Sequence, residues 1–128
     1  MNVVGFLTIH DRGYQGSSDL NDLINEVQNK NENIERVISY LDSGYDFTGV
    51  PLMLYDDDDI PMFGLSYLTD GKWIWPNYYS YYLKKYPFIK LNKEFVNYIE
   101  AMNYIPQMPS IEQVKEIDDF FNVNIWGV

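Results

Sequence analysis

The sequence contains no cysteine among its 128 residues, which excludes disulfide bonds and thiolate metal ligands. It has a single histidine, so any histidine-dependent chemistry would have to use His10. No apolar run approaches the roughly 18 residues that a membrane-spanning helix needs. The first residues lack the basic and apolar regions of a secretory signal. These absences predict a soluble, cytoplasmic protein without a membrane partner.

Positive charge is scarce in the first half of the chain. Residues 1–71 contain 13 acidic and 3 basic side chains, whereas residues 72–128 contain 6 of each, so the first half accounts for the net charge of −10. A field of one sign repels nucleic acid and anionic membranes and attracts basic proteins. We therefore expect a basic protein partner and no nucleic acid, although such a surface can also serve only to keep a protein soluble.

Hydrophobic residues make up 46% of the chain and aromatic residues 17%, more than disordered segments contain. The length predicts a single domain, residues 1–128, with its own core. We expect it to fold without a metal ion, and the sequence indicates no cofactor.

Apolar residues at helical spacing predict five helices. Two precede residue 44, and their apolar faces are Leu20, Leu23, Ile24 and Val27, then Ile34, Val37, Ile38 and Leu41. For the second of these, Asn31 is the expected N-terminal cap and Gly44 the expected left-handed C-cap. The other three span residues 77–86, 92–102 and 110–121, with Asn92 as a cap and a capping box formed by Ser110 and Gln113.

Apolar and aromatic runs at residues 2–9, 50–55, 62–68 and 72–75 predict strands. Asp70-Gly71 between the last two runs is a strong hairpin signal. Residues 122–127 are a candidate edge strand. The order of elements predicts an α+β fold, in which a small antiparallel sheet of three to five strands packs with about five helices.

The run Asp56–Asp59 places four carboxylates between two of these strands. A calcium-binding loop interleaves its acidic ligands with other residues, and consecutive side chains on extended chain point to opposite sides. The run is therefore predicted to be a charged hairpin loop that also protects the strands from pairing with other chains, and no metal ligand is assigned. A carboxylate-based enzyme or a divalent-metal-binding protein remains an alternative function, because a catalytic pair cannot be chosen among 19 acidic residues without geometry.

His10 lies next to Asp11, an arrangement that could suit an oriented base. Neither a serine nucleophile motif nor a cysteine accompanies them. We expect a histidine satisfied by a local hydrogen bond. The sequence assigns no catalytic residue and favours a non-enzymatic function.

Five tyrosines lie within residues 78–86. On a helix, one face would carry Tyr78, Tyr81, Tyr82 and Lys85, and the other would carry Tyr79, Leu83 and Tyr86. One face can join the core, and the other is expected to be partly exposed and suited to an interface. Two alternatives stay open: tyrosines with buried rings and solvated hydroxyls, and a homo-oligomeric or structural module that uses this helix.

Residues 67–100 carry the pattern T-D-G-x-W-x-W-P followed by a tyrosine-rich helix. The matching residues are Thr69, Asp70, Gly71, Trp73, Trp75, Pro76 and Tyr82. Together with the helix-then-glycine stretch at 37–47, about a third of the chain resembles small bacterial proteins of polymorphic-toxin loci. Several of those resemble immunity proteins, which neutralise a cognate toxin by tight binding. The resemblance implies a toxin partner, often a nuclease with a basic cleft, and it carries no catalytic residues.

We therefore interpret the chain as an immunity-like protein that occludes a basic surface of its partner. Alternate carboxylates on an extended segment lie about 6.6 Å apart, which is of the order of phosphate spacing in a nucleic acid. The predicted partner-binding residues are Tyr55, Asp56, Asp57, Asp58, Asp59, Asp70, Tyr78, Tyr81 and Tyr82.

Overall fold

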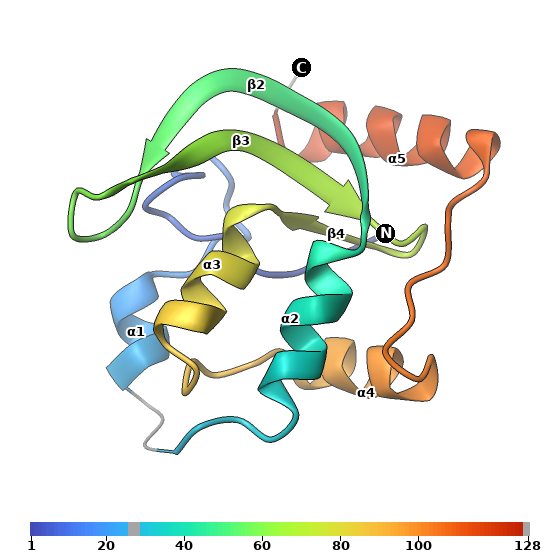
Figure 1. Cartoon of the computed structure of the whole chain (residues 1–128). Coiled ribbons are helices and arrows are strands. Elements are labelled where there is room, and N and C mark those ends of the chain that lie inside the picture. Colours follow the sequence, from blue (N-terminus) through green and yellow to red (C-terminus); the bar gives the residue numbers. More distant parts are fainter. Residues whose placement is uncertain (26–28, 127–128) are drawn as a thin grey trace.

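The computed structural model describes residues 1–25 and 29–126, so Val27 of the first predicted helix lies outside the described residues. In chain order the elements are β1 (Asn2–Val3), α1 (Leu20–Asn25), α2 (Ile34–Asp42), β2 (Tyr45–Tyr55), β3 (Pro61–Thr69), β4 (Trp73–Pro76), α3 (Tyr78–Lys85), α4 (Lys93–Ala101) and α5 (Ile111–Asn124). Over the described ranges these four strands and five helices confirm the α+β fold (Figure 1). None of the helices described is long and apolar enough to cross a membrane.

The strands form one sheet in the order β1-β4-β3-β2. The β2–β3 and β3–β4 pairs are antiparallel, as expected, but β1 pairs parallel to β4, so the sheet is mixed. Gly71 at φ 94° confirms the predicted Asp-Gly turn between β3 and β4. The predicted strand 2–9 shortens to Asn2–Val3 because the chain turns at Gly5, whose φ is 79°.

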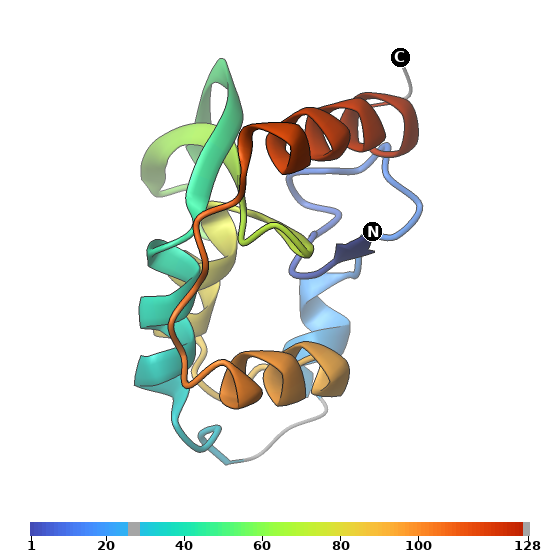
Figure 2. The same ribbon diagram turned by 90° about the vertical axis from the view of Figure 1, so that its right-hand side faces the viewer.

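Helices cover both faces of the sheet. On one face Tyr67 of β3 packs on Phe121 of α5, with ring centroids 4.5 Å apart. On the other face Trp75 of β4 packs on Tyr40 of α2 and Phe95 of α4, each at 6.0 Å. Figures 1 and 2 both show α4 and α5 at opposite ends of the molecule. The sheet therefore lies between α5 and the remaining helices.

The core is mainly aromatic. Its largest fully buried side chains include Trp75, Tyr40, Tyr67, Tyr78, Tyr82, Phe95 and Phe121. The four tyrosines in this set pair their hydroxyls inside the protein, with Asp11, Asp70 or His10. With Tyr79, which is 5% exposed, five of the twelve tyrosines are buried. Both faces of α3 therefore contribute to the core, and the expected partial exposure of one face is found only at the half-buried Tyr81 and Tyr86.

Gly44 does not adopt the predicted left-handed conformation, because Gly5 and Gly71 are the positive-φ glycines of the described chain. It is instead required by close packing, since a Cβ at this position would lie 2.3 Å from the Trp75 ring. The backbone N–H groups of Ser43 and Gly44 bind carbonyls of the last turn of α2.

Two further predictions about helix ends are wrong. Asn31 does not cap α2, because its side-chain amide donates to the carbonyls of Pro87 and Ile89, 3.0 and 2.6 Å away. The candidate edge strand at 122–127 is not found in its described part, which ends at Trp126, since α5 continues to Asn124. The caps predicted at Asn92 and Ser110 are confirmed.

Candidate protein-interaction surface

The aspartate loop, residues 56–59, connects β2 to β3 and projects at one end of the molecule (Figure 1). The loop is closed by Asp56 N–H donating to the Ile60 carbonyl at 2.9 Å, and by Asp59 N–H donating to the Asp56 carbonyl at 3.0 Å. Asp59 adopts φ 61°, a conformation that aspartate tolerates better than most residues. The run therefore forms the predicted hairpin loop.

Asp56 organises this loop from inside, as its residue is only 2% exposed. Its Oδ1 accepts the N–H groups of Asp58 at 2.8 Å and Ile60 at 2.9 Å. Its Oδ2 accepts the Tyr81 hydroxyl at 2.7 Å. Burial opposes ionisation of this carboxyl, but these hydrogen bonds, together with one from Lys85, outweigh burial and hold its pKa well below the usual range.

Lys85 of α3 joins the loop to the helix. Its ammonium lies 3.1 Å from Asp56 Oδ2 and 2.7 Å from a carboxylate oxygen of both Asp57 and Asp58. The Tyr86 hydroxyl also donates to Asp57. The four carboxylates and one ammonium leave a formal charge of −3 on the loop. The loop is thus both strongly acidic and fixed in position on α3.

One carboxylate oxygen from each of Asp56, Asp57 and Asp58 lies within 4.8 Å of the other two, which could suit a metal ion. However, the Lys85 ammonium already contacts an oxygen of all three residues. A divalent ion could bind the three carboxylates only after it had displaced this ammonium. The geometry therefore assigns the cation position to Lys85.

Exposed apolar side chains lie beside the aspartate loop on the same hairpin. Leu52, Met53, Tyr55 and Ile60 are each 53–54% exposed. Asp58 and Asp59 are also exposed. We call the set Leu52, Met53, Tyr55, Asp58, Asp59 and Ile60 the hairpin surface. It belongs partly to β2, which is an edge strand of the sheet, and it combines apolar contact area with negative charge.

The structure brings together only part of the predicted site. Asp70 lies at the opposite end of β3, where it accepts the N–H groups of Lys72 and Trp73 and the Tyr40 hydroxyl. Tyr78 and Tyr82 are completely buried. Asp70, Tyr78, Tyr82 and the buried Asp56 therefore have structural partners, and of the predicted residues Tyr55 and Asp57–Asp59 remain exposed.

Tyr81 and Asp57 both take part in the contacts that hold the loop on α3. Tyr81 is half-buried and donates its hydroxyl to Asp56, so it supports the loop from behind. The Asp57 side chain is 22% exposed and is held by Lys85 and Tyr86. The sequence placed Lys85 on the same helix face as Tyr81, one turn later, but the predicted site did not include it.

His10 and Asp11 form a second polar cluster, which contacts tyrosines of α3. Asp11 accepts the hydroxyls of Tyr67, at 2.7 Å, and Tyr78. His10 Nε2 lies 2.7 Å from the Tyr82 hydroxyl, which matches the expected hydrogen-bonded histidine, although the partner is 72 residues away rather than local.

The protonation of this cluster follows from its burial. Burial lowers the pKa of His10 to about 4, against the opposing influence of Asp56 and Asp57. Burial raises the pKa of Asp11, and hydrogen bonds from Tyr78 and Tyr67 oppose that rise. His10 is therefore neutral near pH 7, so its Nε2 can accept a hydrogen bond from the Tyr82 hydroxyl.

No protein-family model matches the chain, and neither a curated protein nor a solved structure is similar to it. The interpretation of its function therefore depends on the residues and geometry of the chain itself.

Proposed function

We propose that this protein is an immunity-like binding protein that neutralises a cognate toxin by covering a basic surface of it. The observation that carries the proposal is the hairpin surface, in which exposed apolar side chains border a loop of formal charge −3. The resemblance of residues 37–47 and 67–100 to proteins of polymorphic-toxin loci supports the same function.

The two components of the hairpin surface have different tasks in binding. Negative charge speeds the encounter with a basic partner and selects against acidic ones. Buried aromatic and aliphatic anchors supply most of the affinity, and Tyr55 and Ile60 are the anchors that this hairpin offers. Because Lys85 and Tyr81 already hold the loop in place, little conformational entropy is lost on binding.

A toxin nuclease fits this surface best, since its substrate cleft must attract phosphates and is therefore basic. The exposed carboxylates of Asp58 and Asp59 would contact that cleft, although they lie in a turn and not on the extended segment for which the phosphate-like spacing was expected. We place the encounter in the cytoplasm, where such a toxin would meet nucleic acid and where a chain without cysteine has no oxidation-sensitive thiol.

The proposal predicts that a toxin domain is encoded beside this gene, and that domain is the partner used to test it. Producing both proteins in a sensitive bacterial host should restore growth, and the purified proteins should form a complex of defined stoichiometry. The double variant Tyr55→Ala, Ile60→Ser should weaken the complex by about 100-fold, as expected for the loss of two interface anchors. The matched control Met108→Ser, Ile111→Ser alters side chains that are 76% and 89% exposed outside the hairpin and should bind normally.

Electrostatic steering is tested separately by stopped-flow association. Asp58→Asn, Asp59→Asn should lower the association rate and flatten its salt dependence, whereas Asp118→Asn, Asp119→Asn on α5 should change both less. The proposal fails if the neighbouring gene encodes no toxin, if growth is not restored, or if the Tyr55 and Ile60 variant binds like the wild type.

A further inference from the structure

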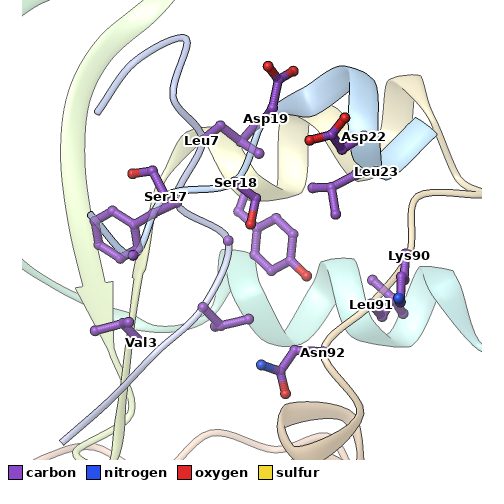
Figure 3. Close-up of a pocket in the computed structure, with 15 residues that line it drawn as sticks. Val3, Leu7, Ser17, Ser18, Asp19, Asp22, Leu23, Lys90, Leu91 and Asn92 are labelled. Atoms are coloured by element: carbon purple, nitrogen blue, oxygen red, sulfur yellow. The ribbon is translucent and has the colours of Figure 1, made fainter. Parts of the chain in front are cut away.

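A cavity of about 480 Å³ lies on a part of the molecule that shares no residue with the hairpin surface. Figure 3 shows side chains from the N-terminal segment, the start of α1 and the segment before α4 around it. Its lining includes the apolar residues Val4, Leu23 and Leu91 and the charged residues Asp19, Asp22 and Lys90. The volume is within the range of pockets that hold small organic ligands.

Tyr79 is the buried tyrosine that differs from the others. Tyr40, Tyr67, Tyr78 and Tyr82 each hydrogen-bond through the hydroxyl to a carboxylate or to His10. The Tyr79 side chain is nearly as enclosed, at 5% exposure against 0–1% for those four, yet within the described chain its hydroxyl has no hydrogen-bond partner. A largely buried hydroxyl without a partner in the protein needs one from water or from a ligand.

The Tyr79 hydroxyl opens into the cavity. Among the described residues, the completely enclosed side-chain atoms that lack a partner are Trp73 Nε1 and Asn77 Oδ1, so the Tyr79 oxygen is not completely enclosed. Tyr79 lines this cavity, and we infer that the little surface that it exposes is directed there. The chain also fixes the ring: Gly5, at φ 79°, passes so close that a Cβ would lie 2.3 Å from Tyr79 Cγ.

The charge around the cavity selects the kind of ligand. Two carboxylates and one ammonium give the lining a formal charge of −1, in the half of the chain that carries the net charge of −10. Asp22 makes no side-chain hydrogen bond within the described ranges, and Asp19 uses one oxygen to accept Asn21 N–H. The two carboxylates disfavour an anionic ligand and attract a cation, and the single ammonium of Lys90 opposes part of that attraction.

We propose that this cavity binds a small amine with an apolar body. The apolar body packs against Val4, Leu23 and Leu91, and the ammonium donates a hydrogen bond to the Tyr79 hydroxyl oxygen in the negative field of Asp19 and Asp22. An ammonium has only donors and a tyrosine oxygen accepts, so the two groups are complementary. This inference does not depend on the proposed binding of a toxin.

Three probes of similar size and different charge test the proposal: 2-phenylethylamine, 2-phenylethanol and 3-phenylpropanoate. Each is titrated into the full chain labelled with ¹⁵N, and amide shifts are followed by NMR. The amine should give saturable shifts at residues 3–7, 17–23 and 90–92 and bind about tenfold more tightly than the alcohol, as expected for a partly screened ion pair. The anion should give no saturable shift there.

Two variants assign the binding to the cavity. Tyr79→Phe, which removes one oxygen, should weaken binding of the amine about three- to tenfold, the value of one hydrogen bond. Asp22→Asn should weaken it about threefold at low salt and less at high salt. The matched controls Tyr45→Phe and Asp119→Asn lie outside the lining and should bind the amine like the wild type.

The proposal is overturned if none of the probes gives saturable shifts at these residues up to its solubility limit. It is also overturned if the anion binds as tightly as the amine, or if Tyr79→Phe leaves the affinity unchanged. Should Tyr79→Phe fail to fold, the exposed Asp22→Asn variant decides the outcome, because an unchanged affinity and salt dependence would contradict the proposed ion pair.

Discussion

The ammonium of Lys85 lies 3.1 Å from Asp56 Oδ2, and this contact joins helix α3 to the turn between β2 and β3. The Asp56 side chain has no exposed surface, whereas that of Lys85 keeps 24% of its own. A buried carboxylate that loses its partner is strongly destabilising. Removing the cation from this ion pair should therefore cost more stability than removing it from a pair on the surface.

We expect Lys85→Met to lower the melting temperature by several degrees, because it removes the cation shared by three carboxylates. The adjacent Lys84 provides the matched control: it makes one ion pair, 3.2 Å from Asp42, between side chains that are 59% and 47% exposed. Lys84→Met should therefore change the melting temperature little. The measurement is thermal unfolding by circular dichroism at low and high salt, and equal effects of the two substitutions would contradict the role assigned to Lys85.

The sequence was sufficient to predict the loop but not its attachment to α3. The position of the four aspartates between two apolar runs predicts a hairpin, because turn position is a local property of the chain. Lys85 lies 27 to 29 residues from its partners. Contacts over that separation depend on how α3 packs against the sheet, and no local pattern specifies this packing.

Tyr78 is the second side chain with a measurable structural role. Its hydroxyl donates to Asp11 and accepts Leu7 N–H at 3.0 Å, so Tyr78→Phe removes a donor from a half-buried carboxylate and leaves a buried N–H unpaired. We expect this variant to lose about 2–4 kcal/mol of the free energy of unfolding. Tyr67→Phe removes one bond to the same carboxylate and a contact with the Trp126 side chain, but it leaves no backbone N–H unpaired, so it should lose about 1–2 kcal/mol.

Urea unfolding of the two variants measures these losses. The comparison is internal, since both substitutions remove one oxygen from a buried ring and leave its apolar contacts in place. A Tyr78→Phe variant no less stable than Tyr67→Phe would show that the Leu7 bond contributes nothing.

These tyrosines also show why the candidate site was predicted only in part. Helical spacing correctly placed Tyr78, Tyr81 and Tyr82 on one face of α3, but spacing does not say what that face contacts. Asp11 lies 67 residues from Tyr78, and Tyr40 lies 30 residues from Asp70. Charged and aromatic side chains that appear suited to a partner were instead paired with each other in the core.

Gly5 supports a prediction about backbone conformation. Its φ of 79° is strained for any other residue, and a Cβ would lie 2.3 Å from the ring of Tyr79. Gly5→Ala should therefore reduce the free energy of unfolding by about 2–4 kcal/mol, through strain and overpacking together. Gly13→Ala is the control, because nothing lies within 4 Å of its Cβ position.

Gly13→Ala should leave stability within about 1 kcal/mol of the wild type, since a compatible alanine restricts mainly the unfolded chain. Urea unfolding of both variants provides the measurement. If Gly5→Ala were as stable as Gly13→Ala, the close approach of the N-terminal segment to Tyr79 would be incorrect, and so would the wall of the cavity that depends on it.

The last prediction concerns the dependence of stability on pH. Burial lowers the pKa of His10 from 6.5 to about 4. Between these two values the unfolded chain binds a proton that the folded protein does not, so stability falls as pH decreases from about 6.5 to 4. The full pKa shift would correspond to a larger loss of unfolding free energy. Because the His10 ring is partly exposed to solvent, we expect a loss of only about 1–2 kcal/mol.

Asp11 acts in the opposite direction, since its pKa is raised in the folded protein and protonation there favours the folded state. The variant His10→Gln separates the two effects. Glutamine can accept the Tyr82 hydroxyl without titrating, so the variant should retain the contribution of Asp11 and lose that of His10. Urea unfolding at pH values from about 7 to 4.5 should then give a shallower fall in stability than in the wild type. Parallel pH profiles for the two proteins would contradict this prediction, because they would show that the pKa of His10 is the same in the folded and unfolded states.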